Sequence, residues 1–248
     1  MKTQAIGVQI LRLLMLGCDR YVMKPFVRIW PKQSGIKILC FGDSNTWGSQ
    51  PGSGLRYPFR ARWPGVVQAE LGQGFVIIEE GHNGRTTDLD DPDQHGCNGM
   101  LALQQCLHVH RPLDLVIILL GTNDLKTSFD RSAIQIAQGV STLGQMVLST
   151  CQSSKGMAPT LLLVVPPVVK GDIHPSGLFQ GADTKSAVLA RHYQQVAADL
   201  GCEFFDAGTI IQSSVVDGVH WEIEAHHVLG RALAQYVRNL FAKAGRVS

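Results

Sequence analysis

One segment indicates the fold of the whole chain: Ile36-Lys-Ile-Leu-Cys-Phe-Gly-Asp-Ser-Asn-Thr-Trp-Gly48. Its first half is apolar, which is typical of a strand buried in a sheet, and it runs directly into a glycine turn. The turn presents Ser44 just past the carboxyl end of the strand, where ligands bind in open α/β sheets. A serine hydroxyl is a weak nucleophile until a base activates it. Ser44 is therefore a candidate nucleophile that needs a base, an orienting carboxylate and oxyanion donors from elsewhere in the chain.

The composition indicates a globular protein that can bury a full core. The 248 residues are 45% hydrophobic and 17% charged, unlike a disordered chain. No apolar run reaches the roughly 18 residues that a membrane span needs. Residues 1–34 carry six Lys or Arg and one Asp out of totals of 22 and 20, which leaves 16 basic and 19 acidic groups in the rest. That part therefore has a net charge of −3 and no basic stripe for nucleic acid.

Residues 1–34 differ from the rest, and we expect them to be an N-terminal extension to one domain at 35–248. Residues 6–17 are apolar, as in a signal peptide, but Arg12 interrupts them and no clean cleavage site follows. We favour a plain appendage, or a start codon assigned too early with Met23 nearer the true start, and a cytoplasmic protein. A periplasmic or secreted protein stays open if the segment is a leader.

The six cysteines show no CxxC spacing. Cys40 falls within the first expected strand and Cys202 beside the last, as small core residues often do. An even count alone is weak evidence for disulfides in a chain of this length. We expect free thiols and a reducing compartment.

From residue 36 onward, short β-branched runs alternate with amphipathic segments. We expect strands at 36–41, 75–79, 114–120, 160–165 and 203–206, and helices near 60–72, 98–109, 131–150, 183–200 and 224–243. Such alternation indicates right-handed βαβ crossovers and a parallel sheet. The sequence therefore predicts a three-layer α/β/α domain with a five-stranded parallel sheet.

Four polar clusters fall where such a sheet would bring them together, each after a predicted strand or before the last helix. They are residues 42–44, 81–85, 121–124 and 217–220. Asp217 and His220 lie three residues apart, so one turn can hold the carboxylate against the Nδ1–H of the imidazole and fix its tautomer. By itself, this pair would more often cap a helix.

The other three clusters offer hydrogen-bond donors. The side-chain amide of Asn123, with the backbone N–H groups of Ser44 and Gly84, would make a three-donor oxyanion hole. Alone, Asn123 would more often satisfy loop backbone in an Asx-turn, and Gly84 would be a turn glycine.

Together, in this order and on this strand pattern, Gly-Asp-Ser, the second-loop glycine, Gly-Thr-Asn-Asp and Asp-x-x-His resemble the SGNH branch of the GDSL hydrolase family. The resemblance covers about residues 35–245 and implies a flavodoxin-like fold. It implies Ser44 as nucleophile, His220 as general base and then acid, and Asp217 as the group that orients His220. The oxyanion would be held by Ser44, Gly84 and Asn123. No G-x-S-x-G elbow occurs, which argues against the ordinary α/β-hydrolase fold.

Residues 40–48, 79–92 and 113–126 look like the arylesterase/acyltransferase branch of that family. The resemblance implies hydrolysis of small acetyl or aryl esters through an acyl-enzyme, acyl transfer to alcohols in some members, and a homo-oligomer that is an octamer in some. Two departures are Trp221-Glu222 after the histidine, where Glu222 is a poor helix cap, and a glycine at position 84, often another small residue in this branch.

Other interpretations stay open. A carbohydrate O-deacetylase would use the same groups, and a thioesterase or lysophospholipase is a third choice. From another class, the chain could be a catalytically silent binding module on this fold. No phosphate-binding loop, dinucleotide fingerprint or HExxH motif occurs, so we expect no cofactor and no metal.

Candidate pocket residues are Trp47, Asp43 and Phe179. Phe179 ends the long irregular stretch 166–179, which we expect to shape the acyl pocket or an intersubunit contact. The acidic loop at 88–95 lacks the ligand order of an EF-hand and is expected to be a solvated loop. His108 and His110 are expected to be structural or surface residues, and at most one of His226 and His227 to line the entrance.

Overall fold

In the computed structural model, which describes residues 35–150 and 158–246, five parallel strands form one sheet in the order β2-β1-β3-β4-β5. The strands are β1 Ile36–Gly42, β2 Phe75–Gly81, β3 Leu115–Leu119, β4 Thr160–Val165 and β5 Glu203–Asp206. The chain leaves β1 for β2 on one side and returns to β3 on the other. The order therefore reverses between β1 and β3, and a crevice forms at such a switch point beyond the carboxyl ends of the strands.

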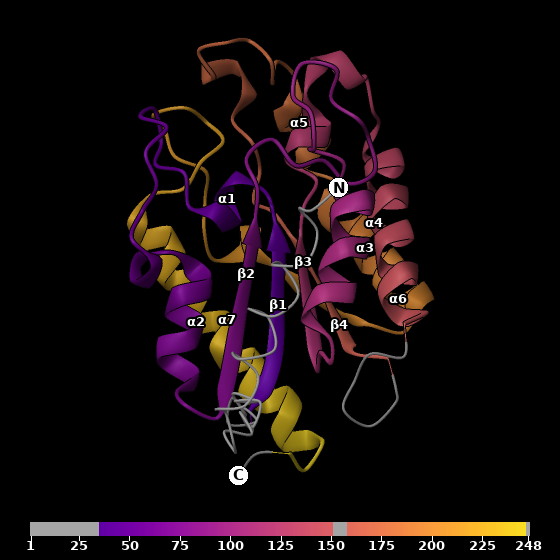
Figure 1. Cartoon of the computed structure of the whole chain (residues 1–248). Helices are drawn as coiled ribbons and strands as arrows, with labels where there is room; N and C mark the ends of the chain where they lie inside the picture. Colours follow the sequence, from indigo (N-terminus) through magenta and orange to yellow (C-terminus); the bar gives the residue numbers. More distant parts are fainter. Residues whose placement is uncertain (1–34, 151–157, 247–248) are drawn as a thin grey trace, which may run out of the picture. The chain divides into compact units, whose positions relative to one another are not determined.

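Seven α-helices are present in the described ranges: α1 Ser44–Trp47, α2 Trp63–Leu71, α3 Gly99–His110, α4 Ala133–Leu148, α5 Ala182–Ser186, α6 Leu189–Leu200 and α7 Ile223–Lys243. Helices α2 and α7 cover one face of the sheet, and α3, α4 and α6 cover the other (Figure 1). The expected three-layer α/β/α domain with a five-stranded parallel sheet is confirmed.

The two-residue period of the strands divides the core between the two faces. In β1, Ile38 packs with Trp63 and Leu233 from the α2 and α7 layer. Leu39 and Phe41 point to the opposite face and pack with α3, α4 and α6. All five residues of β3 are buried, as expected of a central strand that helices cover on both sides.

The expected helix at 183–200 is wrong as a single element, because the chain breaks between α5 and α6. The buried hydroxyl of Ser186 donates to the carbonyl oxygen of Ala182 at 2.7 Å and accepts the N–H of Val169 at 3.0 Å. A serine that bonds helix carbonyls in this way competes with continued helix. The Ser186 hydroxyl therefore connects the end of α5 to Val169, which lies in the segment before that helix.

The prediction of an extension at residues 1–34 lies outside the described residues, as do Cys18 and Cys151. The four described cysteines, Cys40, Cys97, Cys106 and Cys202, are free thiols. No helix of the described ranges is both long and apolar enough to cross a membrane.

Candidate active site

Ser44 lies where β1 ends and α1 begins. Gly42 is the last residue of β1. Only glycine fits there, because a Cβ would lie 2.0 Å from Oγ1 of Thr46. Asp43 caps α1: its Oδ1 accepts the N–H of Asn45 at 2.9 Å. The chain therefore turns sharply and leaves Ser44 at the carboxyl edge of the sheet with 5% of its surface exposed.

The structure brings Ser44, His220 and Asp217 into one hydrogen-bonded chain. Nε2 of His220 lies 3.0 Å from Oγ of Ser44, and its Nδ1 lies 2.8 Å from Oδ2 of Asp217. The His220 side chain is 23% exposed and that of Asp217 is 6% exposed. The imidazole is therefore the more accessible member of the pair to solvent, and the Asp217 carboxylate is buried on the far side of the ring from Ser44.

Asp217 is held by more than the histidine ring. Its Oδ1 accepts the backbone N–H groups of Val219 and His220 at 3.1 and 2.9 Å, and Oδ2 accepts that of Gly52 at 3.0 Å. Burial disfavours the charged form, but the bonds from the His220 ring and these backbone groups outweigh it and hold the pKa of Asp217 well below its usual range. The carboxylate is therefore ionised at neutral pH.

Two of these supports were missed from the sequence. The amide of Asn45 donates to the carbonyl oxygen of Val219 at 3.3 Å and so links the serine turn to the histidine loop. Gly52, in the loop between α1 and α2, reaches Asp217 across 165 positions of sequence. Asn45 stands inside the motif and could have been noticed, whereas nothing in the sequence around Gly52 indicates its contact.

The second and third loops carry the other two expected oxyanion donors, Gly84 and Asn123. Gly84 has a φ of 78°, and a Cβ there would lie 2.1 Å from Oε1 of Gln94, so this left-handed turn favours glycine. The amide of Asn123 donates to the carbonyl oxygen of Arg85 at 3.0 Å, which leaves its second N–H for another acceptor. Among the described residues, the backbone N–H groups of Ser44 and Gly84 meet no acceptor.

Asp124 fastens these two loops together. Its carboxylate accepts the backbone N–H of Thr87 at 3.0 Å and the Thr87 hydroxyl at 2.5 Å. Burial, opposed by these bonds, raises the pKa of Asp124 to about 6. The bonds between Thr87 and Asp124 therefore hold together the two loops that contain Gly84 and Asn123.

The three candidate pocket residues lie in different surroundings. Asp43 is fully buried and Phe179 is 4% exposed within the core, and their place in a substrate pocket stays a prediction. Asp43 is used in capping α1 and Phe179 in anchoring its loop. Trp47 stays partly exposed, with the Arg56 guanidinium 4.8 Å above its ring, and remains a candidate.

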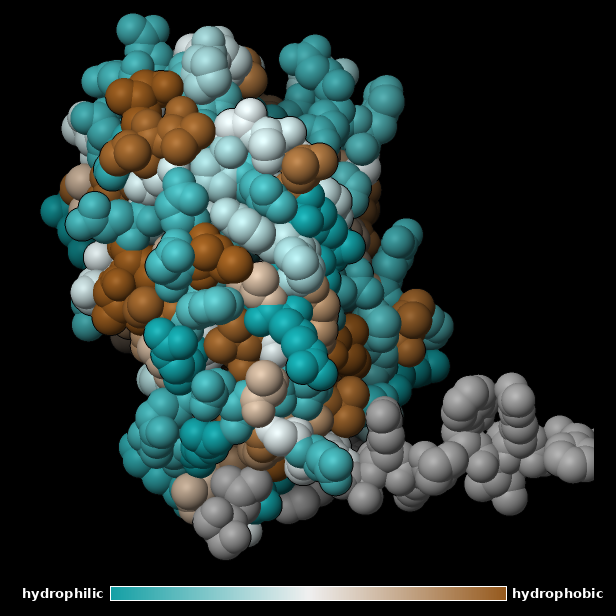
Figure 2. Space-filling model, turned by 90° about the vertical axis from the view of Figure 1, so that its left-hand side faces the viewer, coloured by the Kyte–Doolittle hydropathy of each residue, from teal (hydrophilic) through white to brown (hydrophobic). Residues whose placement is uncertain are grey.

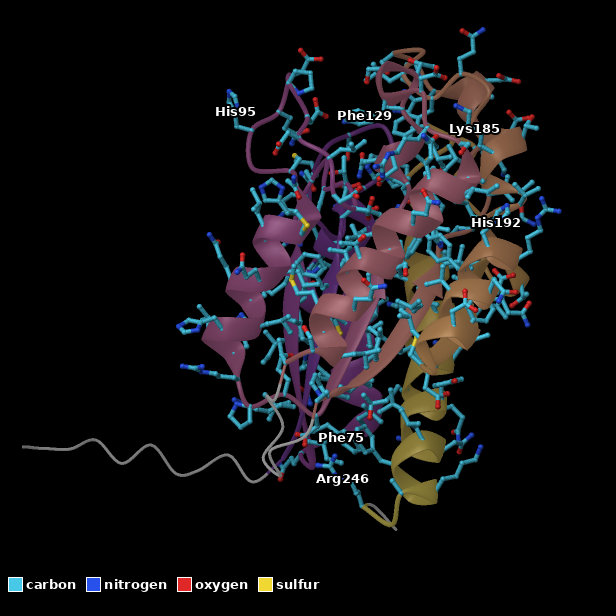
Figure 3. All side chains as sticks on the ribbon, turned by 90° about the vertical axis from the view of Figure 1, so that its right-hand side faces the viewer. Phe75, His95, Phe129, Lys185, His192 and Arg246 are labelled. Carbon is cyan, nitrogen blue, oxygen red and sulfur yellow. The ribbon has the colours of Figure 1, made fainter. Side chains whose placement is uncertain are left out.

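The acidic loop is less solvated than expected. Asp91 pairs with Lys126 at 2.7 Å, and Asp88 with Arg131 at 2.6 Å. His95 is exposed and projects from this loop near the top of the face that carries α3 (Figure 3). Ion pairs therefore hold the carboxylates of Asp88 and Asp91, whereas Asp90, Asp93 and His95 are exposed.

Glu222 and His226 lie at the start of α7. Glu222 makes no side-chain cap, as expected, and instead accepts the Ser214 hydroxyl at 2.5 Å. His226 is fully buried between Tyr57 and Trp221, and burial lowers its pKa to about 3. His226 therefore does not line the entrance.

The site and fold define an ester hydrolase of the SGNH type, and comparisons with known proteins agree. The sequence profile described as the GDSL-like lipase/acylhydrolase family matches residues 40–239. The chain belongs to this family and is a carboxylic ester hydrolase. No curated protein matches the chain significantly.

Several solved structures are similar over nearly their whole length. A carbohydrate acetylesterase from Sinorhizobium meliloti is 42% identical, with a TM-score of 0.78 over 83% of this chain and 99% of that one. An aryl esterase from M. smegmatis is 42% identical, with a TM-score of 0.79 over 83% of this chain and 100% of that one. A second carbohydrate acetylesterase family member from S. meliloti is 35% identical, with a TM-score of 0.78 over 84% and 99%.

Proposed function

We propose that this chain hydrolyses small acyl esters through an acyl-enzyme on Ser44. The observation that carries the proposal is the hydrogen-bonded chain from Oγ of Ser44 through the His220 ring to Asp217. In this arrangement His220 can take the serine proton through Nε2, while Asp217 stabilises the imidazolium and keeps the productive tautomer.

The reaction would proceed in two displacements. Oγ of Ser44 attacks the ester carbonyl as its proton passes to His220, and the oxyanion lies among the N–H groups of Ser44, Gly84 and Asn123. His220 then gives the proton to the leaving alcohol. Water attacks the acyl-enzyme with His220 again as base, which releases the acid and restores the serine.

The loop at 166–179 supports a small acyl pocket. The N–H of Lys170 donates to the carbonyl oxygen of Gly218 at 2.8 Å, so this loop packs directly on the loop that carries Asp217 and His220. His174 lies 4.9 Å from the Phe179 ring, centroid to centroid, and the charges of Asp217 and His220 act on it. We infer that His174 and Trp47 border the acyl site.

Hydrolysis of p-nitrophenyl acetate, butyrate and octanoate tests this assignment. We expect acetate to turn over fastest, a steep fall with acyl length, and no activity in Ser44→Ala. Equal rates on all three esters would contradict a small pocket. Full activity in Ser44→Ala would remove the nucleophile assignment.

A carbohydrate O-deacetylase is the second candidate, because two of the similar solved structures are described as carbohydrate acetylesterases. Acetate release from peracetylated glucose and from phenyl acetate, compared as kcat/KM, separates the two. A kcat/KM on the sugar at least tenfold higher would favour the carbohydrate substrate, and the reverse ratio would favour the aryl ester.

Oligomerisation, acyl transfer and a cytoplasmic location remain proposals. Leu55, Val215 and Val216 are 64%, 76% and 56% exposed, and apolar surface gathers on the upper part of the face that α2 and its neighbouring loops form (Figure 2). Burial of such surface between copies would stabilise a homo-oligomer. Light scattering of the purified protein tests this, and product analysis with excess alcohol tests acyl transfer. Fractionation of the source cells tests the location.

A further inference from the structure

A second cluster of reactive side chains lies outside the proposed catalytic site. Glu80 of β2 and Cys106 and His110 of α3 place a carboxylate oxygen, a thiol sulfur and an imidazole nitrogen within 4.8 Å of one another. Nε2 of His110 lies 2.6 Å from Oε1 of Glu80. The proposed esterase mechanism uses none of these three groups.

The fold brings the three side chains together on rigid elements. Cys106 and His110 are four residues apart on α3, so they share one face of the helix. Glu80 is next to the end of β2, the edge strand of the sheet. It lies two positions after Ile78, which packs against the core cluster that contains Leu103 and Leu107 of α3. Ile78 and Glu80 therefore point to the face that α3 covers.

The cluster is open to solvent on one side. The side chains of Glu80 and His110 are 32% and 24% exposed, whereas Cys106 is 9% exposed. An ion could therefore enter past the carboxylate and the imidazole and meet the sulfur at the inner end. Helix α3 lies on the face shown in Figure 3, away from the α2 and α7 layer.

We propose that Glu80, Cys106 and His110 bind a divalent transition metal ion such as Zn²⁺, with a fourth position open to water. Thiolate, imidazole and carboxylate are the three ligand types that zinc takes in proteins. Tetrahedral coordination at ordinary zinc bond lengths separates the donor atoms by about 3.3–3.6 Å. The three donor atoms lie within 4.8 Å of one another, and binding of the ion would bring them to this spacing.

Binding exchanges a proton for the metal. Burial, with the Glu80 charge, raises the pKa of the Cys106 thiol to about 12, so the thiol is protonated without an ion. As the metal–sulfur bond forms, the thiol proton passes to solvent and the His110–Glu80 hydrogen bond is replaced by two metal–ligand bonds.

One nearby cation weakens the site. The Arg85 guanidinium stacks 4.3 Å from the Phe41 ring centroid and donates to the carbonyl oxygen of Gly42 at 2.8 Å, and its charge acts on both Cys106 and Glu80. Ionised Cys106 and Glu80 supply two negative charges that balance the metal. We therefore expect reversible binding that is weaker than that of a four-ligand structural zinc site.

Cobalt titration of the full-length, tag-free chain tests the proposal. Co²⁺ bound to a thiolate gives a near-ultraviolet charge-transfer band, which reports the metal–sulfur bond directly. Replacing Cys18 and Cys151 by serine beforehand removes the two cysteines that the structure does not describe. We expect one Co²⁺ per chain, displaced by Zn²⁺, with the band lost in Cys106→Ser and binding at least tenfold weaker in His110→Gln.

His108→Gln is the matched control, because His108 is an exposed histidine two residues away on the same helix. It should bind cobalt as the parent does. Zinc should also raise the thermal midpoint of the parent, and His110→Gln should abolish that rise. His110 is partly exposed, so His110→Gln should fold even if Cys106→Ser does not. The His110→Gln variant therefore tests the proposal by itself. Absence of the charge-transfer band in the parent, or a band that survives Cys106→Ser, would overturn the proposal.

Discussion

Replacing Asp217 by asparagine keeps the shape of the side chain and exchanges one acceptor oxygen for an NH₂ donor. Each carboxylate oxygen now accepts two N–H groups: Oδ1 those of Val219 and His220, and Oδ2 those of Gly52 and the His220 ring. The new NH₂ therefore faces two donors in either orientation. With the NH₂ toward the ring, Nδ1 of His220 must accept, so the ring proton moves to Nε2.

A proton on Nε2 points at Oγ of Ser44, 3.0 Å away, and the ring then cannot take the serine proton. The expected loss in kcat is about 10⁴-fold, or about 5.5 kcal/mol of transition-state stabilisation. KM should change little, because the acyl site does not include Asp217. The loss of charge-assisted bonds should also lower the free energy of unfolding by about 2 kcal/mol.

The assay is steady-state hydrolysis of p-nitrophenyl acetate, with circular dichroism to verify folding. Asp114→Asn is the matched control: Asp114 is a buried carboxylate that accepts the N–H of Lys37 at 2.8 Å at the amino end of β3. It should lose stability and keep kcat. A folded Asp217→Asn variant with kcat within tenfold of the wild type would refute the tautomer argument, as would an equal loss in the control.

Three further changes have defined outcomes. Asn123→Ala removes one oxyanion donor and should lower kcat about 10²–10³-fold with little change in KM; an unchanged kcat would exclude it from the oxyanion hole. Burial raises the pKa of Asp43 to about 6, so ionisation of this carboxyl destabilises the folded state increasingly as pH rises from about 4 to 6. Asp43→Asn should therefore gain up to about 3 kcal/mol over the wild type at pH 8 relative to pH 4; a thermal-unfolding difference that is the same at both pH values would contradict this. Gly42→Ala would place its Cβ 2.0 Å from Oγ1 of Thr46 and 2.7 Å from the carbonyl oxygen of Leu119. It should lower the free energy of unfolding by about 1–3 kcal/mol in urea titration, and wild-type stability would mean that the turn relaxes.

The strands and the grouping of the site could be predicted because local patterns determine both. Each polar cluster follows an apolar strand or precedes the last helix, and parallel strands bring their carboxyl ends to one edge. Ser44, His220 and Asp217 therefore meet as expected, while their catalytic roles remain proposals.

Contacts between distant loops could not be predicted. The bond from Gly52 to Asp217 depends on how one loop folds over another, which no local pattern encodes. The break at Ser186 involves a hydrogen bond that its hydroxyl accepts from the backbone N–H of Val169, 17 positions earlier. The full burial of Asp43 does not follow from its position beside Ser44, because consecutive side chains at a strand end point in different directions.

The cluster of Glu80, Cys106 and His110 was missed for a similar reason. His110 lies near His108 in an ordinary stretch of sequence, and Glu80 lies one residue beyond the expected end of its strand. Only the packing of α3 on the edge strand brings the three donors together.

The most direct test of the central claim is mass spectrometry of the protein after treatment with a fluorophosphonate, which labels only an activated serine. We expect a single adduct on Ser44, absent in Ser44→Ala and formed far more slowly in His220→Ala. A wild-type protein that stays unlabelled would match a silent binding module, and a label on another serine would contradict the assignment of the nucleophile.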